Sequence, residues 1–363
     1  MPRAMIAGTT ITNGQSIIKS TTGRDGQSFT LGQINLKAEK VEVQKTTPGD
    51  LLSQIGSSHE FTITTNVPNY GDYQDWTNPQ FSISDTPTSN LTTQFGADNA
   101  GIGVKANGVA LTSGTDYTVT KAANGNGFTV TLSNPLKQSG NAITVTYTAV
   151  VNAVGVDKTN NTASVTFDNN PQDHSSHGTG TTDSTKHLYV ASVPLQKIAF
   201  SDPNTILLGA QFTVTAGTAN TPVKFHDYGN GVYGIVKDGA VDAQGNPVVT
   251  VDHITSSDTQ IVIKGLNADS TDATTYTFKE TKAPTDYLLG DNPVQFTLTV
   301  QPTYKEPAKK TLAGVTYSMD SANYKNFMAF RCLVWVGWSG GGGWRVVWGY
   351  GYHVVVHRRL AVA

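Results

Sequence analysis

The chain has 363 residues and a formal net charge of −2, and only 14% of its residues are charged. This length predicts two or three domains with cores of their own, and the balanced charge argues against nucleic acid as a partner. A single cysteine, Cys332, excludes an internal disulfide and a cysteine-rich metal cluster, and we expect no cofactor. Neither a secretory signal pattern nor a run of ~18 apolar residues is found, so we expect no export or membrane-anchoring device in this sequence.

The first half of the chain has the pattern of an all-β domain. Residues 1–35 are ambiguous, and two interpretations stay open: the remnant of a truncated N-terminal domain, or a disordered leader. From residue 36 to 172, alternating segments such as HEFTITTNV, GFTVTLS and NAITVTYTAVV are separated by clusters of Asn, Gly, Asp and Pro. This alternation predicts antiparallel strands joined by turns, and the short spacing is typical of an immunoglobulin-like β-sandwich.

A second domain follows a polar interruption. The stretch from 173 to 187 is rich in small polar residues, and LYVASVPLQK then restarts the strand pattern, so we predict a linker followed by a second β-sandwich over residues 188–326. His174, His177 and His187 could be metal ligands. Because no third ligand type stands at a fixed spacing from them, a solvated linker is the better interpretation.

The last segment, residues 327–363, differs in composition from the rest. It holds four of the five tryptophans together with many Gly, Val and Arg residues, while Thr and Asn vanish. One interpretation is a functional aromatic surface. The hypothesis we prefer is translation in a shifted reading frame that begins near Asn326, because Gly-rich DNA read out of register yields Trp, Arg, Gly and Val codons. As a folded segment it would be apolar, exposed and prone to aggregation.

Polar residues interrupt the inward face of several predicted strands. In a strand alternate side chains share a face, so each of these residues is the next inward position after apolar ones. Burying an ionised group without a partner is costly, although a strand end often lets such a residue reach solvent. The first domain offers a lysine, a carboxylate and an amide, and the second a lysine and a carboxylate: Lys45, Asp85, Asn169, Lys197 and Glu280.

Together these three residue types define a reaction. A lysine amine surrounded by apolar side chains loses its proton more easily, and only the neutral amine is a nucleophile. A carboxylic acid kept protonated nearby can polarise an asparagine carbonyl and shuttle protons. Attack of the amine on the asparagine side chain then releases ammonia and leaves an isopeptide bond. We therefore predict intramolecular Lys–Asn isopeptide bonds in tandem immunoglobulin-like β-sandwiches.

The second domain resembles the collagen-adhesin B-type domains of Gram-positive surface proteins. YTFKETKAPTDYLL is similar to their E-box, which supplies a catalytic glutamate, here Glu280. VPLQKIAFSDPNTILLGAQFTVT is similar to their opening strand pair, with Lys197 at the reacting position. The matching positions are Tyr276, Glu280, Thr281, Ala283, Pro284 and Tyr287 in the E-box, and Gly209, Ala210 and Phe212 in the opening pair.

The first domain resembles the fimbrial isopeptide-forming domain of pilin backbone subunits. The matching segments are KTTPGDLLSQIGSSHEFTITTNVPNY, FSISDTPTSNLT and TASVTFDNNP. This resemblance implies Asp85 as the catalytic acid and Lys45 with Asn169 as the bonded pair. In the second domain it implies an asparagine at the end of the last strand, for which Asn326 is the first choice and Asn323 the second.

The resemblance also implies partners. Pilin backbones present a lysine that sortase joins to a sibling subunit. Lys37 lies at about the position of that lysine in the sequence, but it lacks the usual Tyr-Pro context. An ordinary exposed lysine is therefore the default interpretation of Lys37. No sortase sorting motif follows the second domain here. The implied location is nevertheless extracellular, on a bacterial cell wall.

The function that follows is structural: a subunit of a Gram-positive pilus or surface stalk that supports adhesion. An alternative is an adhesin that binds host matrix or glycan directly, for which Tyr70, Tyr73 and Trp76 in NYGDYQDW are candidate loop aromatics, if they do not cap the core instead. We expect no enzyme acting on an external substrate, because the sequence has no Ser/His/Asp set, zinc-ligand run or phosphate-binding glycine loop.

Overall fold

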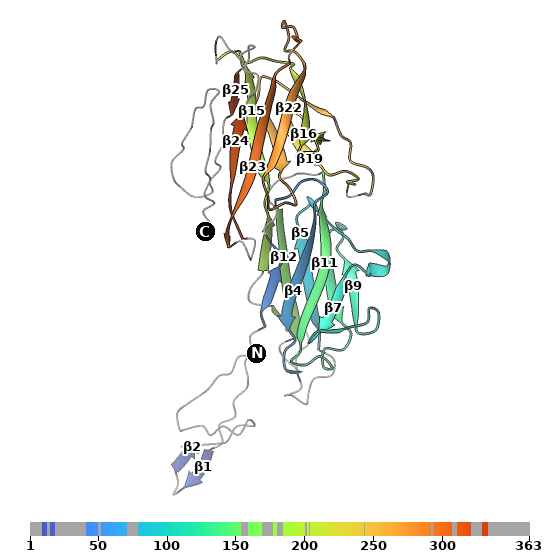
Figure 1. Cartoon of the computed structure of the whole chain (residues 1–363). Helices are drawn as coiled ribbons and strands as arrows, with labels where there is room; N and C mark the ends of the chain where they lie inside the picture. The colour runs from blue at the N-terminus through green and yellow to red at the C-terminus, as the bar shows by residue number, and fades with distance from the viewer. Residues whose placement is uncertain are drawn as a thin grey trace.

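The computed structural model describes two β-sandwiches stacked end to end (Figure 1). Apart from short 3₁₀ segments such as Ala97–Asn99, the described residues form strands, turns and loops, and none of their helices is long and apolar enough to cross a membrane. The expected all-β fold is thus confirmed. The residues that the structure describes are 9–12, 15–18, 41–49, 52–70, 79–153, 159–168, 177–179, 184–199, 202, 204–242, 244–291, 293–306, 311–320 and 329–332.

The first sandwich packs two sheets face to face, and strictly alternating strands supply its core. β11, for example, buries one face along its whole length and leaves most of the other half-buried, with Ile143, Val145, Tyr147 and Ala149 turned inward. One sheet has the order β13 (His177–Thr179), β12 (Thr159–Asp168), β5 (Phe81–Pro87), β10 (Phe128–Leu132) and β9 (Tyr117–Lys121), with β14 (Ser184–Leu188) also paired to β12. The other has the order β3 (Val43–Thr46), β4 (Ser58–Asn66), β11 (Ala142–Val151), β7 (Gly103–Ala106) and β8 (Val109–Ala110), with β6 (Leu91–Thr93) also paired to β11.

The second sandwich repeats the two-layer plan with a different strand order. One sheet has the order β18 (Lys224–Asp227), β19 (Val232–Val236), β21 (Ile261–Leu266), β15 (Ala191–Ile198) and β25 (Ala329–Cys332), and its β19–β21 pair is parallel. The other has the order β17 (Thr221–Pro222), β16 (Gln211–Ala216), β22 (Thr274–Lys282), β23 (Gln295–Glu306) and β24 (Thr311–Asp320), with β20 (His253–Thr255) also paired to β16. A short hairpin, β1 (Thr9–Thr12) and β2 (Gln15–Ile18), precedes both sandwiches.

Part of the stretch expected to be a linker, residues 173–187, is strand. β13 and β14 both pair with β12, so they extend a sheet of the first sandwich. Their small polar residues give no alternating apolar signal in the sequence, whereas main-chain pairing with β12 forms the strands. Leu188 is the last residue of the first core, and, apart from Leu52, the core of the second sandwich begins at Ala191. The boundary between the domains therefore falls within a few residues of Tyr189.

The first sandwich reaches into the second through residues 52–57, the segment between β3 and β4. Leu52 is 1% exposed and packs in the core of the second sandwich. The Ile55 N–H donates to the Ile235 carbonyl at 3.1 Å, and the Lys237 N–H donates to the Ile55 carbonyl at 2.9 Å, so the segment pairs in parallel with β19. Gly56 has φ +90°, and a Cβ there would lie 2.8 Å from the Cβ of Ala240. Only glycine allows this approach.

A buried histidine lies at the same junction. His59 is 5% exposed, and its Nε2 lies 3.0 Å from the Ser53 Oγ. Burial lowers the pKa of His59 below its ordinary value of 6.5, with the nearby Asp269 opposing this effect and Lys237 adding to it. The Asp269 N–H donates to the Leu52 carbonyl at 2.9 Å, and its carboxylate pairs with the Lys237 amine at 3.0 Å. The junction thus combines an apolar anchor with a polar group that the fold keeps neutral.

Truncating the apolar anchor should weaken the second sandwich, although the residue belongs to the first. We expect Leu52→Ala to lower the free energy of unfolding by about 2–5 kcal/mol, because it leaves a cavity in a core. Urea unfolding measures this. Leu288→Ala is the matched control, since Leu288 is 94% exposed and its loss should change little. Equal effects of the two substitutions would contradict this role of Leu52.

The histidine makes the junction sensitive to acid. Because the folded pKa of His59 lies below its ordinary value of 6.5, the unfolded chain takes up a proton first as the pH falls. The contribution of His59 to stability should be complete above about pH 7 and should decline as the pH drops below 6.5. Urea unfolding at a series of pH values tests this, with His59→Gln as the variant that should flatten the decline. An identical pH dependence in both proteins would show that another group is responsible.

Candidate sites of internal cross-linking

In the first sandwich, three strands bring a lysine, an aspartate and an asparagine to one point between the sheets. Lys45 stands on β3, the edge strand of one sheet, whereas Asp85 on β5 and Asn161 on β12 face it from the other sheet. Each occupies an inward position of its alternating strand, as the sequence predicted for Lys45 and Asp85. The antiparallel register places Asp85 opposite Ala163, which sets Asn161 beside the carboxylate.

The three side chains form a closed network with a tyrosine. The Lys45 Nζ contacts both the Asp85 Oδ1 and the Asn161 Oδ1. The Asn161 Nδ2 donates to the Tyr147 hydroxyl at 2.9 Å, and that hydroxyl donates to the Asp85 Oδ2 at 2.8 Å. None of the four residues is more than 3% exposed. Water is therefore largely excluded from the amine, the amide and the acid.

The apolar surroundings change the protonation of this group. The Lys45 Nζ lies 5.2 Å from the ring centroid of Phe61 and 5.4 Å from that of Tyr147, and Phe128 packs edge-on against the same tyrosine. Burial lowers the pKa of Lys45 to about 8, although the Asp85 charge opposes the shift. Burial likewise raises the pKa of Asp85 above its usual range, against the effect of Lys45. Both shifts favour a neutral amine beside a neutral acid.

Sequence analysis missed Asn161 as the asparagine beside Lys45. It proposed Asn169, which lies outside the described residues. In the sequence both asparagines have the parity of the apolar positions Ala163, Val165 and Phe167, so parity alone does not separate them. The register of β12 against β5 separates them. Ala163 lies opposite Asp85, whereas Phe167 lies opposite Phe81, toward the other end of β5. The signal in the sequence was an asparagine two positions before Ala163, at the beginning of the apolar row and not at its end.

The second sandwich has a related pair. Lys197 on β15 and Glu280 on β22 face each other across the sandwich, with 3.4 Å between the Lys197 Nζ and the Glu280 Oε1. They are 1% and 2% exposed. Burial lowers the pKa of Lys197 to about 8 and raises that of Glu280, and in each case the partner's charge opposes the shift. The Phe212 ring centroid lies 5.7 Å from the amine, which again gives the amine an apolar environment.

The asparagine proposed for this second site, Asn326, lies outside the described residues, as does its alternative, Asn323. The chain returns to β15 shortly afterwards, since β25 pairs with it antiparallel and sets Phe330 opposite Lys197. The backbone that follows Asn326 thus runs beside the strand that carries Lys197. β25 lies within residues 327–363, the segment for which the sequence favours a shifted reading frame.

Other residues singled out from the sequence have varied positions. In the segment that resembles an E-box, the Tyr276 hydroxyl accepts a 2.7 Å hydrogen bond from the Asn267 N–H, whereas Tyr287 is 47% exposed. Tyr70 is fully buried and its hydroxyl donates to the Asp168 carbonyl at 3.2 Å, so it caps the core and is not an exposed loop aromatic. Tyr73, Trp76, Lys37 and His174 lie outside the described residues.

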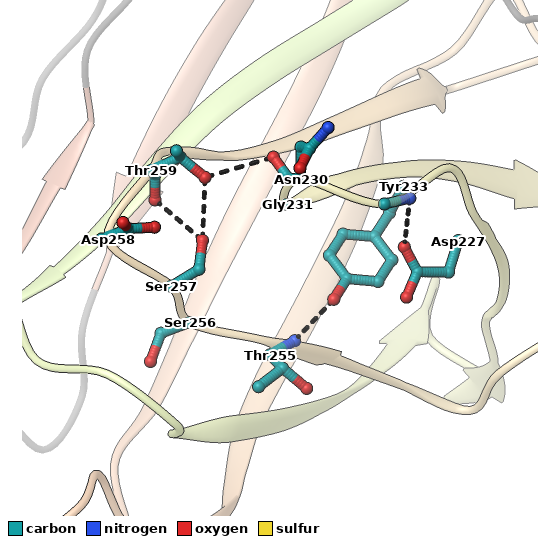
Figure 2. A pocket seen from close by; sticks show the side chains of 10 residues that line it. Asp227, Asn230, Gly231, Tyr233, Thr255, Ser256, Ser257, Asp258 and Thr259 are labelled. Atoms are coloured by element: carbon teal, nitrogen blue, oxygen red, sulfur yellow. Dashed lines mark hydrogen bonds between the residues drawn. The ribbon is translucent and has the colours of Figure 1, made fainter.

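A surface cavity of about 310 Å³ lies on the second sandwich (Figure 2), and neither Lys45 nor Lys197 lines it. Its lining groups bond mainly to one another: the Thr255 N–H donates to the Tyr233 hydroxyl at 3.2 Å, and the Gly229 N–H donates to the Asp227 carboxylate at 2.8 Å. The Thr259 hydroxyl donates to the Asn230 carbonyl at 3.1 Å. These are the bonds of tight loops, and we assign no binding role to the cavity.

The fold and these pairs define a class of protein: tandem β-sandwiches with a buried lysine and carboxylic acid between the sheets of each. Comparison with known families adds a more specific assignment for one of them. Residues 191–312 match the family model of the SpaA prealbumin-like fold domain. The matched residues cover most of the second sandwich. A search of curated proteins found no match.

Several solved structures of Gram-positive pilins are similar to this chain. The C-terminal fragment of the major pilin GBS80 of Streptococcus agalactiae has 20% identity and a TM-score of 0.46, over 71% of this chain and 91% of that one. The pilus 2b backbone protein of group B streptococcus has 23% identity and a TM-score of 0.46, over 69% and 88%. Full-length RrgB from Streptococcus pneumoniae has 15% identity and a TM-score of 0.49, over 77% and 76%.

Proposed function

We propose that each sandwich forms an isopeptide bond within itself, and that the cross-linked chain is a structural subunit of a Gram-positive pilus or surface stalk. The observation that carries the proposal is the contact of the Lys45 amine with both Asp85 and the Asn161 side chain in a buried pocket. Nucleophile, acid and target carbonyl are thus held together before any bond forms. Such positioning removes much of the entropic barrier to reaction.

In the first sandwich the reaction begins with a proton shift inside the buried pair. The Lys45 Nζ passes a proton to the Asp85 carboxylate, which leaves a neutral amine and a neutral acid. With an amine pKa of about 8, roughly a tenth of the amines are neutral at pH 7, against about one in three thousand for an ordinary lysine. The amine attacks the Asn161 Cγ, the Cγ–Nδ2 bond breaks, and ammonia leaves as the new amide forms. The product is neutral, which relieves the cost of burying two charges.

In the second sandwich we assign the same chemistry to Lys197 and Glu280, with Asn326 as the target and Asn323 as the alternative. The support for this assignment is the buried lysine–acid pair with a lowered amine pKa and a raised acid pKa. The position of β25 beside β15 adds to it, because the chain just after Asn326 passes Lys197. No external substrate is involved, since each domain reacts once with itself.

The bonds would strengthen the fold against heat and force. Lys45 and Asn161 are 116 positions apart, and by the relation used for disulfides a loop of ~100 residues restricts the unfolded chain by about 4.7 kcal/mol at 25 °C. β3 and β12 lie near the two ends of the first domain in sequence. A pulling force between these strands would pass through the covalent bond and would not unzip the sheets one hydrogen bond at a time. The single cysteine leaves no disulfide to do this.

This mechanical role is the basis for proposing a surface shaft. The match of residues 191–312 to the SpaA prealbumin-like fold domain supports the same role. In this proposal the chain is displayed on a bacterial cell wall, and sortase joins it to sibling subunits, with Lys37 as the candidate linkage lysine. For direct binding of host matrix or glycan, the described residues offer no favourable observation, since Tyr70 of the candidate aromatic loop is buried.

The intact mass of the natively folded chain tests the proposal. Each isopeptide bond removes one molecule of ammonia, so the wild-type chain should be lighter than its sequence mass by two. Asp85→Ala should restore one ammonia and Glu280→Ala the other, because the buried acid moves the protons in each reaction. Each variant should also lose resistance to heat and protease. A wild-type mass equal to the sequence mass would contradict the proposal.

The choice of asparagine has its own test with a matched control. Asn161→Ala should retain the ammonia of the first domain, because it removes the carbonyl that contacts Lys45. Asn169→Ala, eight positions along the same strand pattern, should lose ammonia as the wild type does. The reverse result would move the bond to Asn169 and away from the site built around Asp85.

A further inference from the structure

Tyr147 has an unusual position in the first site. It stands on β11 directly opposite Phe61 of β4, and its ring stacks on that phenylalanine with 5.5 Å between the ring centroids. Tyr147 is 3% exposed. Its hydroxyl oxygen lies 2.9 Å from the Asn161 amide nitrogen and 2.8 Å from the Asp85 Oδ2. These are the two groups between which a proton must move during the reaction. A tyrosine needed only for packing would need one hydrogen-bond partner, not these two.

The reaction requires a proton on the leaving nitrogen, since an amide nitrogen departs as ammonia and not as an anion. Asp85 is the acid of the site, but the hydrogen bond of the Asn161 Nδ2 goes to the Tyr147 hydroxyl and not to the Asp85 carboxylate. Its Oδ1 contacts the Lys45 amine and its Oδ2 accepts from Tyr147. The Tyr147 hydroxyl is the group that contacts both the acid and the leaving nitrogen. Burial raises the pKa of Tyr147, so the hydroxyl is protonated before the reaction and has a proton to donate to the leaving nitrogen.

We propose that Tyr147 is a catalytic residue of the first site, whose hydroxyl relays a proton from Asp85 to the leaving nitrogen of Asn161. This inference rests on the proposed isopeptide reaction and adds a step to it. It does not extend to the second site, where the acid, Glu280, faces Lys197 at 3.4 Å and its Oε1 has no hydrogen bond among the described residues.

The proton transfers balance. After the neutral Lys45 amine has added to the Asn161 Cγ, the Nζ carries an extra proton and the former carbonyl oxygen a negative charge. Before the relay, the Asp85 carboxyl group, which Lys45 protonated at Oδ1, rotates so that its proton faces the Tyr147 oxygen, and the Tyr147 hydroxyl, which donates to Oδ2 in the resting site, turns toward Nδ2. The acid proton then passes to the Tyr147 oxygen, the tyrosine's own proton passes to Nδ2, and the Nζ proton passes to the carboxylate oxygen that faces Lys45. The oxyanion pair then reforms the carbonyl, the Cγ–Nδ2 bond breaks, and ammonia departs. Asp85 and Tyr147 end as they began.

Cell-free synthesis followed by timed quenching and mass spectrometry tests the relay, because it catches the chain before the bonds are complete. We expect Tyr147→Phe to slow ammonia loss from the first domain by at least ~10²-fold, the low end of general acid–base contributions. The second domain of the same molecule should lose its ammonia at the wild-type rate. Peptide digests assign each loss to its domain.

Tyr117→Phe is the matched control. Tyr117 is another buried tyrosine of the same core, and its hydroxyl donates to the Ile102 carbonyl at 3.1 Å, away from the site. It should leave both rates unchanged. If Tyr147→Phe and Tyr117→Phe react at the same rate as the wild type, the relay is wrong while the isopeptide reaction stands. If the wild-type chain loses no ammonia at all, the proposed function itself fails.

A second measurement separates proton transfer from structure, should the phenylalanine variant fold poorly. Synthesis with 3-fluorotyrosine in place of tyrosine keeps the shape of the side chain and makes its hydroxyl more acidic. The relay predicts a changed rate in the first domain and an unchanged rate in the second. The same substitution in the Tyr147→Phe background should have no effect on the first domain. An unchanged first-domain rate in the otherwise wild-type chain would assign Tyr147 a packing role only.

Discussion

The burial of a lysine amine against a carboxylic acid between two sheets is the interaction on which the rest of this account depends. Two ionised groups removed from water lose more solvation energy than their attraction returns, unless the geometry is very good. In both sandwiches the pair is almost fully buried among aromatic rings, and burial shifts each pKa toward the neutral form. A site that makes the amine neutral also makes it a nucleophile. The same burial that would destabilise the unreacted fold would therefore favour the proposed reaction, which removes the charges.

The strand that carries the first lysine also connects the two domains. β3 holds Lys45 and leads, within a few residues, into the segment whose Leu52 completes the core of the second sandwich. The main-chain bond from Ser53 to Tyr189 ties the same segment to the connection between the domains. A cross-link at Lys45 would therefore fix one end of the segment that anchors the junction. The covalent bond at Lys45 and the packing of Leu52 in the second sandwich would then both stabilise the same segment of the chain.

Sequence reasoning located part of this arrangement and missed the rest for identifiable reasons. Alternation along a strand shows which face a side chain occupies, and this was enough to place Lys45, Asp85, Lys197 and Glu280 inside. It does not show how far along its neighbour a residue lies, so Asn161 was overlooked until the β5–β12 register was known. Tyr147 gave no signal at all, because an inward aromatic residue is what any core strand contains. The strands between 177 and 188 cannot be predicted from alternation, because no apolar pattern marks them and only their pairing with β12 defines them.

Tandem mass spectrometry of a digest of the natively folded protein tests the central claim most directly. The account predicts a branched peptide in which the Lys45 side chain is joined through an amide to the side chain of Asn161, with fragment ions from both strands. Recovery of the Lys45 peptide as a linear species, with its amine free to be acetylated after denaturation, would contradict it.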